Sequence, residues 1–186
     1  MSSAEVADLV QRVARREPGA FEQLVHVQGP SLLRFVRTLT SSDEAAEDVL
    51  QEALVDILRG AKGYRGGDAR AWVFRIARNA AYRSHRRRSG QPEHFEPLAE
   101  LGAKAGWGDE APDEKVGVEE RRACLRKAIS RLSTSDQEIL VLRELEGFTG
   151  AEVSAMLELS VPAMKSRLHR ARLRLAAAVE EERCRD

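Results

Sequence analysis

Apolar side chains recur at every third or fourth position along most of this chain, and this spacing restricts its fold more than any other feature. Such a period places the apolar residues on one face of an α-helix, whereas a half-buried strand would need alternation at every second position. No segment of the sequence alternates in that way. The sequence therefore predicts an all-α fold built from small helical domains.

The helical period stops once, between residues 89 and 118, where prolines and glycines gather. Three of the six prolines and five of the thirteen glycines lie in this stretch, and both residue types interrupt helices. Residues 91–118 also carry 7 acidic and 2 basic side chains, a local excess that the net charge of +0 conceals. We therefore predict two helical domains, residues 1–90 and 118–186, joined by a flexible acidic linker at residues 91–117.

Periodicity and capping signals together predict where the helices lie. The expected ranges are 4–16, 18–28, 31–39, 42–59 and 68–87, and then 118–131, 134–146, 149–157 and 161–182. Three hydroxyl residues have a glutamate or glutamine three positions later, the spacing of a capping box: Ser41, Thr134 and Thr149. Pro18 and Pro162 fall in expected first turns, where a proline is tolerated.

Several classes of protein are disfavoured by what the sequence lacks. No apolar run reaches the ~18 residues that cross a bilayer, and the N-terminus lacks the layout of a signal peptide, so we expect a cytoplasmic protein without membrane insertion. Phosphate-loop, serine-hydrolase and zinc-protease motifs are absent, so no enzyme activity, cofactor or metal is expected. Cys124 and Cys184 are isolated and predict neither a disulfide framework nor a zinc site, and Cys124 is expected in the core.

An acidic stripe runs along the helix expected at residues 42–59. Asp48, Glu52 and Asp56 are four residues apart, with Gln51 beside them, so the three carboxylates share one helix face. A solvated surface is the ordinary explanation of such a stripe. However, like charges at this spacing destabilise a helix by roughly 0.2–0.5 kcal/mol, and no lysine or arginine at the same spacing relieves them. The stripe therefore favours an external basic partner.

Residues 69–92 hold seven arginines and no acid, and aromatic side chains lie among and before them: Tyr64, Trp72, Phe74 and Tyr82. Arginines that contact phosphates and aromatic rings that stack on bases are the combination that binds single-stranded nucleic acid. Core packing is the competing interpretation, and it is preferred for Phe74. The two glycines before this helix, Gly66 and Gly67, would let a ligand approach the backbone closely.

The C-terminal domain ends with the spacing of a helix-turn-helix. A capped helix from Thr149 is followed by a short turn, by Ser160 as the next N-cap, and by a second helix. Its expected inward positions are Val161, Met164, Leu168, Ala171 and Leu175. Between Lys165 and Arg174 there are five basic residues and no acid. This favours DNA binding, although tetratricopeptide-like hairpins and three-helix bundles share the spacing.

In this order, the motifs resemble those of the bacterial extracytoplasmic-function (ECF) sigma factors, group 4 of the sigma-70 family. The resemblance covers nearly all of the chain and rests on five segments: Ala46–Glu52, Tyr64–Asp68, Trp72–Asn79, Leu140–Gly147 and Lys165–Arg172. It implies a promoter-specific initiation factor that binds core RNA polymerase, recognises the minus-ten and minus-thirty-five elements and melts the DNA. It also makes an anti-sigma partner expected.

The resemblance further implies a role for individual residues. Those expected to face the clamp helices of the polymerase largest subunit are Asp48, Gln51 and Glu52, while the C-terminal domain is expected on the polymerase flap. Those expected at the minus-ten element, where a base is flipped out, are Tyr64, Arg65, Asp68, Trp72, Arg75, Arg78, Asn79, Arg83 and Arg86. Those expected in the major groove at the minus-thirty-five element are Lys165, Ser166, His169, Arg170 and Arg172. The acidic linker resembles the family's connector through the RNA path.

The chain departs from the family pattern at a few positions. Arg83 stands where many members have aspartate, Glu158 stands where the turn normally has glycine, and Pro162 and Ala163 begin the recognition helix. Two other functions compete with the sigma factor. One is a helix-turn-helix regulator that acts without core polymerase, and the other is an RNA-binding adaptor that uses the first domain. Promoter-specific initiation with core polymerase would distinguish the sigma factor from both.

Overall fold

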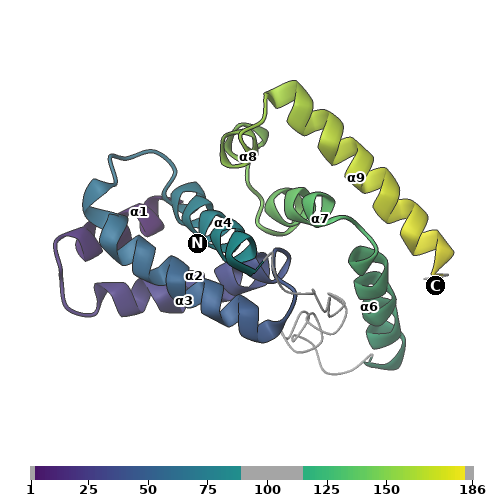
Figure 1. Cartoon of the computed structure of the whole chain (residues 1–186), viewed down its shortest axis with the longest axis horizontal. Helices are drawn as coiled ribbons and strands as arrows, with labels where there is room; N and C mark the ends of the chain where they lie inside the picture. Colours follow the sequence, from purple (N-terminus) through teal and green to yellow (C-terminus); the bar gives the residue numbers. More distant parts are fainter. Residues whose placement is uncertain (1–2, 89–114, 183–186) are drawn as a thin grey trace.

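The computed structural model describes residues 3–88 and 115–182 (Figure 1). Throughout these two ranges the regular elements are helices and none is a strand, which confirms the all-α prediction. Most of the predicted linker lies outside the described residues. Its last three positions are the exception, because α6 begins at Lys115, three residues before the predicted helix.

The N-terminal half contains four helices and one short 3-10 helix: α1 (Ser3–Ala14), α2 (Ala20–Arg37), α3 (Asp43–Gly60), η1 (Ala61–Gly63) and α4 (Ala69–Arg88). Helix α3 packs against both α2 and α4, and α1 lies against α2, η1 and α4. Val10, Leu24 and Ile57 are buried where these helices meet. The long helix α4 thus has one side in this core and another side directed away from it.

The C-terminal half contains the elements α6 (Lys115–Ser130), α7 (Thr134–Leu140), η2 (Val141–Leu145), α8 (Gly150–Leu157) and α9 (Val161–Glu181). Helix α9 packs against α6, α7 and α8. The sequence predicts one regular helix at residues 134–146, but η2 is wound as a π-helix. This wider winding changes the direction of the side chains that follow it, and Glu146 is buried while Glu144 and Leu145 are exposed.

Helix α2 differs from the prediction of two helices interrupted at Gly29 and Pro30. It continues through Pro30 without a break. The buried positions Leu24, Gln28 and Leu32 keep the same helix face toward the core on both sides of the proline. Continuous burial of this face therefore outweighs the helix penalty of an internal proline, about 3 kcal/mol. The start also differs, since α2 begins at Ala20 and Pro18 lies before it.

Two of the predicted caps are displaced by one residue. Ser42, and not Ser41, accepts a hydrogen bond from Ala45 N at 3.1 Å. Ser133, and not Thr134, accepts one from Asp136 N at 3.2 Å. The predicted cap at Thr149 is confirmed, because its side chain and that of Glu152 form a complete capping box. In each pair of adjacent hydroxyl residues, the one that remains in the extended conformation becomes the cap.

The turn between α8 and α9 has the geometry of a glycine turn although it lacks glycine. Glu158 ends α8 with φ 56° and ψ 40°, in the left-handed region. A residue with a Cβ atom adopts this region at a penalty of roughly 1–2 kcal/mol, which glycine avoids. The departure at this position therefore makes the turn less stable than glycine would, and Ser160 caps α9 by accepting from Ala163 N at 3.3 Å.

Cys124 contradicts the expectation of two unpaired thiols. It is half-buried and disulfide-bonded, while Cys184, the second cysteine of the sequence, lies outside the described residues. The Sγ atom of Cys124 lies 3.7 Å from the carbonyl oxygen of Glu182, because α6 packs against the end of α9. Among the described residues, no helix is long and apolar enough to span a bilayer, and no group of potential ligands could hold a metal ion.

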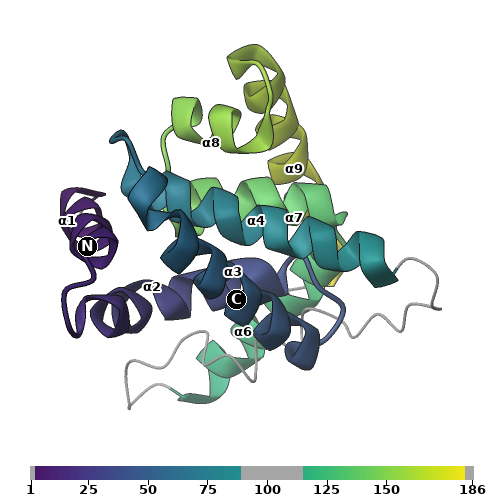
Figure 2. The same ribbon diagram turned by 60° about the vertical axis from the view of Figure 1, so that its left-hand side comes forward.

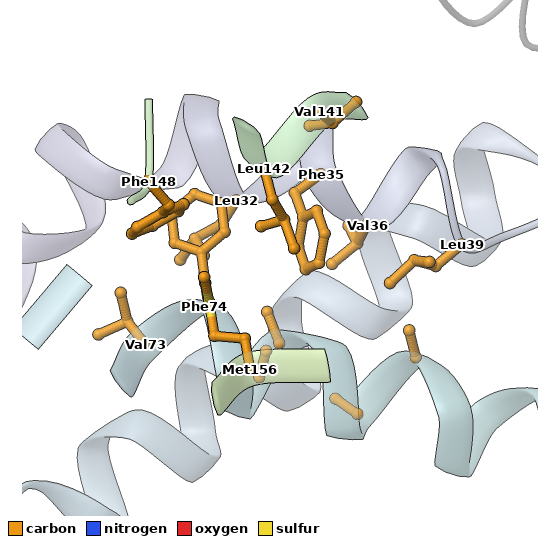
Figure 3. Close-up of a cluster of buried hydrophobic side chains, with 14 of the residues drawn as sticks. Leu32, Phe35, Val36, Leu39, Val73, Phe74, Val141, Leu142, Phe148 and Met156 are labelled. Atoms are coloured by element: carbon orange, nitrogen blue, oxygen red, sulfur yellow. The ribbon is translucent and has the colours of Figure 1, made fainter. Parts of the chain in front are cut away.

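The two halves pack against each other and share one hydrophobic core. Helix α8 contacts α4, and Figures 1 and 2 both show α4 beside the C-terminal helices α7 and α8. Figure 3 shows Leu142, Phe148 and Met156 of the C-terminal half next to Phe35 and Phe74 of the N-terminal half. The ring centroids of Phe74 and Phe148 are 5.0 Å apart. Figure 3 thus shows the apolar contact that joins two domains which the sequence presents as separate.

Candidate nucleic-acid and protein interfaces

Helix α3 carries an exposed stripe whose members follow one another at intervals of three and four residues: Asp48, Gln51, Val55 and Leu58. Val55 is 42% exposed and Leu58 is 46% exposed. The polar half of this stripe was predicted from the sequence, and its apolar half was not. The signal available in the sequence was the spacing, because Val55 and Leu58 continue the row of Asp48 and Gln51 at intervals of four and three residues. An amphipathic stripe of this kind can receive a partner helix that has basic and apolar side chains.

The acidic stripe is relieved within the molecule, contrary to the sequence-based argument that it needs an external partner. Glu52 accepts from Arg87 Nη2 at 2.6 and 2.8 Å and lies 3.4 Å from Arg83. Arg83 also pairs with Asp56. Spacing along one helix cannot reveal this relief, because the arginines come from the neighbouring helix α4. This contact also gives Arg83 a partner on α3 at the position where the chain departs from the family pattern.

The loop before α4 forms a small aromatic platform. The rings of Tyr64 and Trp72 lie 5.4 Å apart, and the Tyr64 hydroxyl donates to the carbonyl oxygen of Gly67 at 2.6 Å. Gly66 and Gly67 have φ values of 97° and 93°, which favour glycine. Partial burial, and then the negative charge of Asp68, raise the pKa of Tyr64. The hydroxyl therefore remains a protonated donor at neutral pH.

Other members of the predicted minus-ten set also have structural contacts. The Asp68 side chain accepts from Ala71 N at 2.6 Å and so caps α4, and Arg65 donates to the carbonyl oxygen of Lys62 at 2.8 Å. Arg78 donates to Glu138 of the C-terminal half at 2.8 Å. Arg75, Asn79 and Arg86 are exposed. The structure thus places Arg75, Asn79 and Arg86 at the surface, while Arg78 is engaged between the two halves.

The recognition helix α9 has a clear division into two faces. Met164, Leu168 and Ala171 are buried as predicted, and Leu175 is half-buried. Val161 is 43% exposed, contrary to the prediction, because it lies in the first turn. The five residues predicted to meet the major groove are all exposed: Lys165, Ser166, His169, Arg170 and Arg172. Arg172 additionally pairs with Glu144 at 2.6 Å.

The polar residues that join the two halves were not predicted from the sequence. Glu146 is 6% exposed and accepts from Arg34 of α2 at 2.7 Å and from Arg70 of α4 at 3.1 Å. Glu138 is 1% exposed and accepts from Arg78 and, at 3.4 Å, from the Tyr82 hydroxyl. The sequence offered one signal, the presence of Glu138 and Glu146 close to the apolar residues of the predicted helix at 134–146. Their partners are 56 to 112 residues away along the chain.

Two family models match this chain, one in each half. Residues 24–91 match sigma-70 region 2, and residues 122–175 match sigma-70 region 4. The first match includes α3, the aromatic loop and α4, and the second includes the helix-turn-helix. A regulator that works only through the C-terminal domain is therefore not favoured.

Proteins with known names are similar to the chain over most of its length. It is 30% identical over 158 residues to the ECF RNA polymerase sigma factor SigM of Mycobacterium tuberculosis, covering 84% of this chain and 76% of that protein. It is 29% identical over 179 residues to the RNA polymerase sigma-H factor of Pseudomonas aeruginosa, covering 92% of each.

Solved structures are similar as well. The structure of CnrH in complex with the cytosolic domain of CnrY has a TM-score of 0.66 and 26% identity, covering 94% of this chain and 97% of that one. The sigma factor RpoE in complex with the anti-sigma factor NepR from Bartonella quintana has the same TM-score and identity, covering 87% and 98%. With both sigma regions present in one helical chain, this protein belongs to the ECF RNA polymerase sigma factors, the promoter-specific initiation factors that bind core polymerase.

Proposed function

We propose that this chain divides initiation among three surfaces: α3 binds core polymerase, the aromatic loop with α4 holds the melted minus-ten element, and α9 reads the minus-thirty-five element. The observation that carries the proposal is the separation of the three surfaces. They lie on α3, on the loop with α4, and on α9, and each has exposed side chains, while Tyr64 and Trp72 of the second surface are half-buried against the core. An anti-sigma factor, such as those bound to the similar solved structures, is the expected negative regulator.

The polymerase contact is assigned to the exposed stripe of α3. Asp48 and Gln51 supply the polar contacts. Val55 and Leu58 supply apolar surface, and its removal from water by a partner helix favours binding. Glu52 is already paired with Arg83 and Arg87. Glu52 can still join the interface if it releases Arg83 or Arg87 and pairs with a basic residue of the polymerase clamp.

The minus-ten contact is assigned to the platform of Tyr64 and Trp72 with Arg65 in the same loop, and to Arg75, Asn79 and Arg86, which follow along α4. A flipped base needs a flat apolar surface and a donor or acceptor for its edge. The accessible face of one of these two tilted rings would provide the first, and the exposed Asn79 side chain on α4 would provide the second. The exposed arginines of α4 would contact phosphates, which position the strand without reading its sequence.

The experiment that tests this assignment is run-off transcription with core polymerase on duplex and premelted promoters. Asp48→Lys should abolish initiation on both templates because it prevents holoenzyme formation. Asn79→Ala should lose initiation on duplex DNA by at least about tenfold and retain more of it on the premelted template, because unstacking the base requires a few kcal/mol only when the duplex is intact.

Glu22→Lys is the matched control for charge, since Glu22 is an exposed residue of α2 and should initiate normally. Equal losses for Asn79→Ala on both templates would contradict its assignment to melting. Normal initiation by Asp48→Lys would contradict the polymerase surface. Failure of the wild-type chain to direct initiation with any core polymerase would contradict the function itself.

A further inference from the structure

We propose that Arg87 of α4 is a contact to the DNA backbone, which Glu52 of α3 occupies in the free chain and which core polymerase releases when it binds Glu52. The polymerase surface of α3 and the minus-ten surface of α4 meet at this ion pair. Arg87 lies outside the predicted minus-ten set, and its assignment rests on the proposed function.

Glu52 lies at the border between the polymerase surface and α4. It follows Asp48 by one helical turn and stands next to Gln51 in the sequence, so its side chain emerges beside the exposed stripe of α3. Its carboxylate contacts α4, where Arg87 Nη2 donates to Oε1 at 2.8 Å and to Oε2 at 2.6 Å. One arginine thus engages both of the oxygens that a basic group of the polymerase would need.

The pair is exposed enough to exchange partners. The side chains of Glu52 and Arg87 are 33% and 63% exposed, whereas those of Glu138 and Glu146, between the two halves, are 1% and 3% exposed. An exposed ion pair contributes little to stability, because water solvates both groups when it separates. Breaking a buried pair instead leaves an uncompensated charge. Exchange is therefore easier at Glu52 than at either buried glutamate.

Asp56 keeps α3 joined to α4 while Glu52 changes its partner. Arg83 pairs with Asp56, one turn further along α3, and lies 3.4 Å from Glu52. When Glu52 pairs with another basic group, Arg87 loses both of its hydrogen bonds to α3, but Arg83 retains Asp56. The exchange therefore frees the side chain of Arg87 without separating the two helices.

An open hollow of about 440 Å³ near the end of α4 is lined by Glu52, Arg83, Arg86 and Arg87. Glu52 is the one acidic residue among these four. Once a basic group of the polymerase neutralises its charge, three arginines line the same space, and guanidinium groups bind phosphate oxygens through paired hydrogen bonds. Arg75, Asn79 and Arg86 of the predicted minus-ten set precede Arg87 along α4. A DNA strand that follows these residues reaches the hollow at the end of the helix.

Exchange at Glu52 couples polymerase binding to DNA binding. The coupling is reciprocal, so a group that pairs with Glu52 strengthens phosphate binding by Arg87, and a phosphate at Arg87 strengthens pairing of Glu52 by the same factor. The free chain therefore binds DNA through α4 less tightly than the holoenzyme does.

A double-mutant cycle in the free, full-length chain tests the pair without polymerase. Fluorescence anisotropy measures binding to a labelled single-stranded DNA oligonucleotide of mixed sequence, because phosphate contacts do not read sequence. Arg87→Gln should weaken binding about threefold more in the Glu52→Ala background than in wild type. In the Glu52→Ala background alone it should lower the salt slope by ~0.7. Contacts made by α9 are present in all four proteins and cancel in the cycle.

Glu47→Ala and Arg59→Gln are the matched controls, since both residues are exposed on α3 and the charge changes are the same. In the Glu47→Ala background, Arg87→Gln should have only its wild-type effect. Arg59→Gln should have one effect whether Glu52 is present or not. Circular dichroism verifies the helices, and Glu52→Gln repeats the cycle if the alanine variant loses them. An effect of Arg87→Gln that is the same in both Glu52 backgrounds, or is absent from both, would overturn the control by Glu52.

The role of polymerase is measured with the same substitution in the holoenzyme. Without DNA, Arg87→Gln should bind core polymerase about threefold more tightly than wild type, because Glu52 no longer has to release a partner. The variant holoenzyme should bind a premelted promoter about threefold more weakly, because the phosphate contact is missing. A loss of arginine with a merely structural role would not change the two affinities in opposite directions.

Unchanged DNA binding by the Arg87→Gln holoenzyme would overturn release by polymerase. Weaker binding of this variant to core polymerase would overturn it too, because Arg87 would then contact the enzyme itself. A wild-type chain that binds no core polymerase would contradict the proposed function, while the cycle in the free chain would still decide whether Glu52 controls Arg87.

Discussion

At the scale of single residues, the packing of the two halves changes the pKa of the Glu138 side chain. Its carboxyl is almost fully buried, and burial raises its pKa, although Arg78, Arg167 and the Tyr82 hydroxyl offset part of that effect. The groups that face it are therefore two arginines and a phenol, from α4 and α9. The protonation of a glutamate in the helix predicted at residues 134–146 therefore depends on how the two halves pack.

The raised pKa predicts a pH dependence of stability. Because the folded chain holds the proton of Glu138 more tightly than the unfolded chain does, this residue's contribution is fully present below its ordinary pKa of 4.5 and is lost as the pH rises through the raised value. Glu138→Gln cannot titrate. The free energy of unfolding of wild type relative to Glu138→Gln should therefore fall as the pH rises above about 4.5.

Urea unfolding at several pH values measures this difference, and Glu180→Gln serves as the exposed control. If the free energy of unfolding of wild type relative to Glu138→Gln rises with pH, the site favours the charged form of Glu138, and the prediction is wrong.

At the scale of elements, α2 has an internal proline at an exposed position, and this gives a direct test of helix energetics. Pro30 lies inside the helix and its ring faces solvent. Pro30→Ala should increase the free energy of unfolding by about 1–2 kcal/mol, because the alanine restores a helical N–H donor and removes the ring, while losing some of the rigidity that proline gives to the unfolded chain.

Thermal or urea unfolding provides the measurement for Pro30→Ala. Pro18→Ala is the matched control, since Pro18 is exposed and precedes the helix, and it should yield no such increase. A loss of stability in Pro30→Ala would indicate that the proline supports a bend on which the packing of α2 depends.

The recognition helix α9 allows base reading to be distinguished from backbone binding. Arg170 is exposed, whereas Arg172 is fixed by its ion pair with Glu144. Arg170→Ala should remove about 1–3 kcal/mol of discrimination at one promoter position, as expected for a bidentate contact to guanine. Arg172→Ala should weaken all promoters about equally and lower the salt slope by about one unit.

Binding of holoenzyme to single-base promoter variants at two salt concentrations compares the two substitutions. If the ranking of the variants is the same for Arg170→Ala and wild type, α9 contacts the backbone through this face and the base-reading residues lie elsewhere.

At the scale of the whole molecule, one hydrophobic core extends across both halves, and this predicts how the chain unfolds. Wild type should unfold in a single calorimetric transition, because Phe148 of one half is buried against Phe74 of the other. Phe148→Ala should lower the free energy of unfolding by about 3 kcal/mol and separate the transition into two. Leu173→Ala, at a position that is 57% exposed, should leave one transition. Two transitions in wild type would mean that the halves are energetically independent.

The sequence by itself determined the features that depend on neighbours along the chain. The helical period predicted the all-α fold, and the capping box at Thr149 predicted where α8 begins. The residues predicted on the outward face of α9, from Lys165 to Arg172, are exposed. Each of these follows from contacts within about four residues, which helical spacing makes visible.

Only the tertiary structure decided the features that depend on residues far apart. The acidic residues of α3 pair with arginines of α4. Helix α2 continues through Pro30 because its buried face is continuous. Arg78 pairs with Glu138, 60 residues away along the chain. Helical periodicity states which face of a helix is buried but not which helix covers it. The joining of the two halves was therefore beyond the sequence, because the glutamates and arginines that meet there become neighbours only when α4 packs against the C-terminal half.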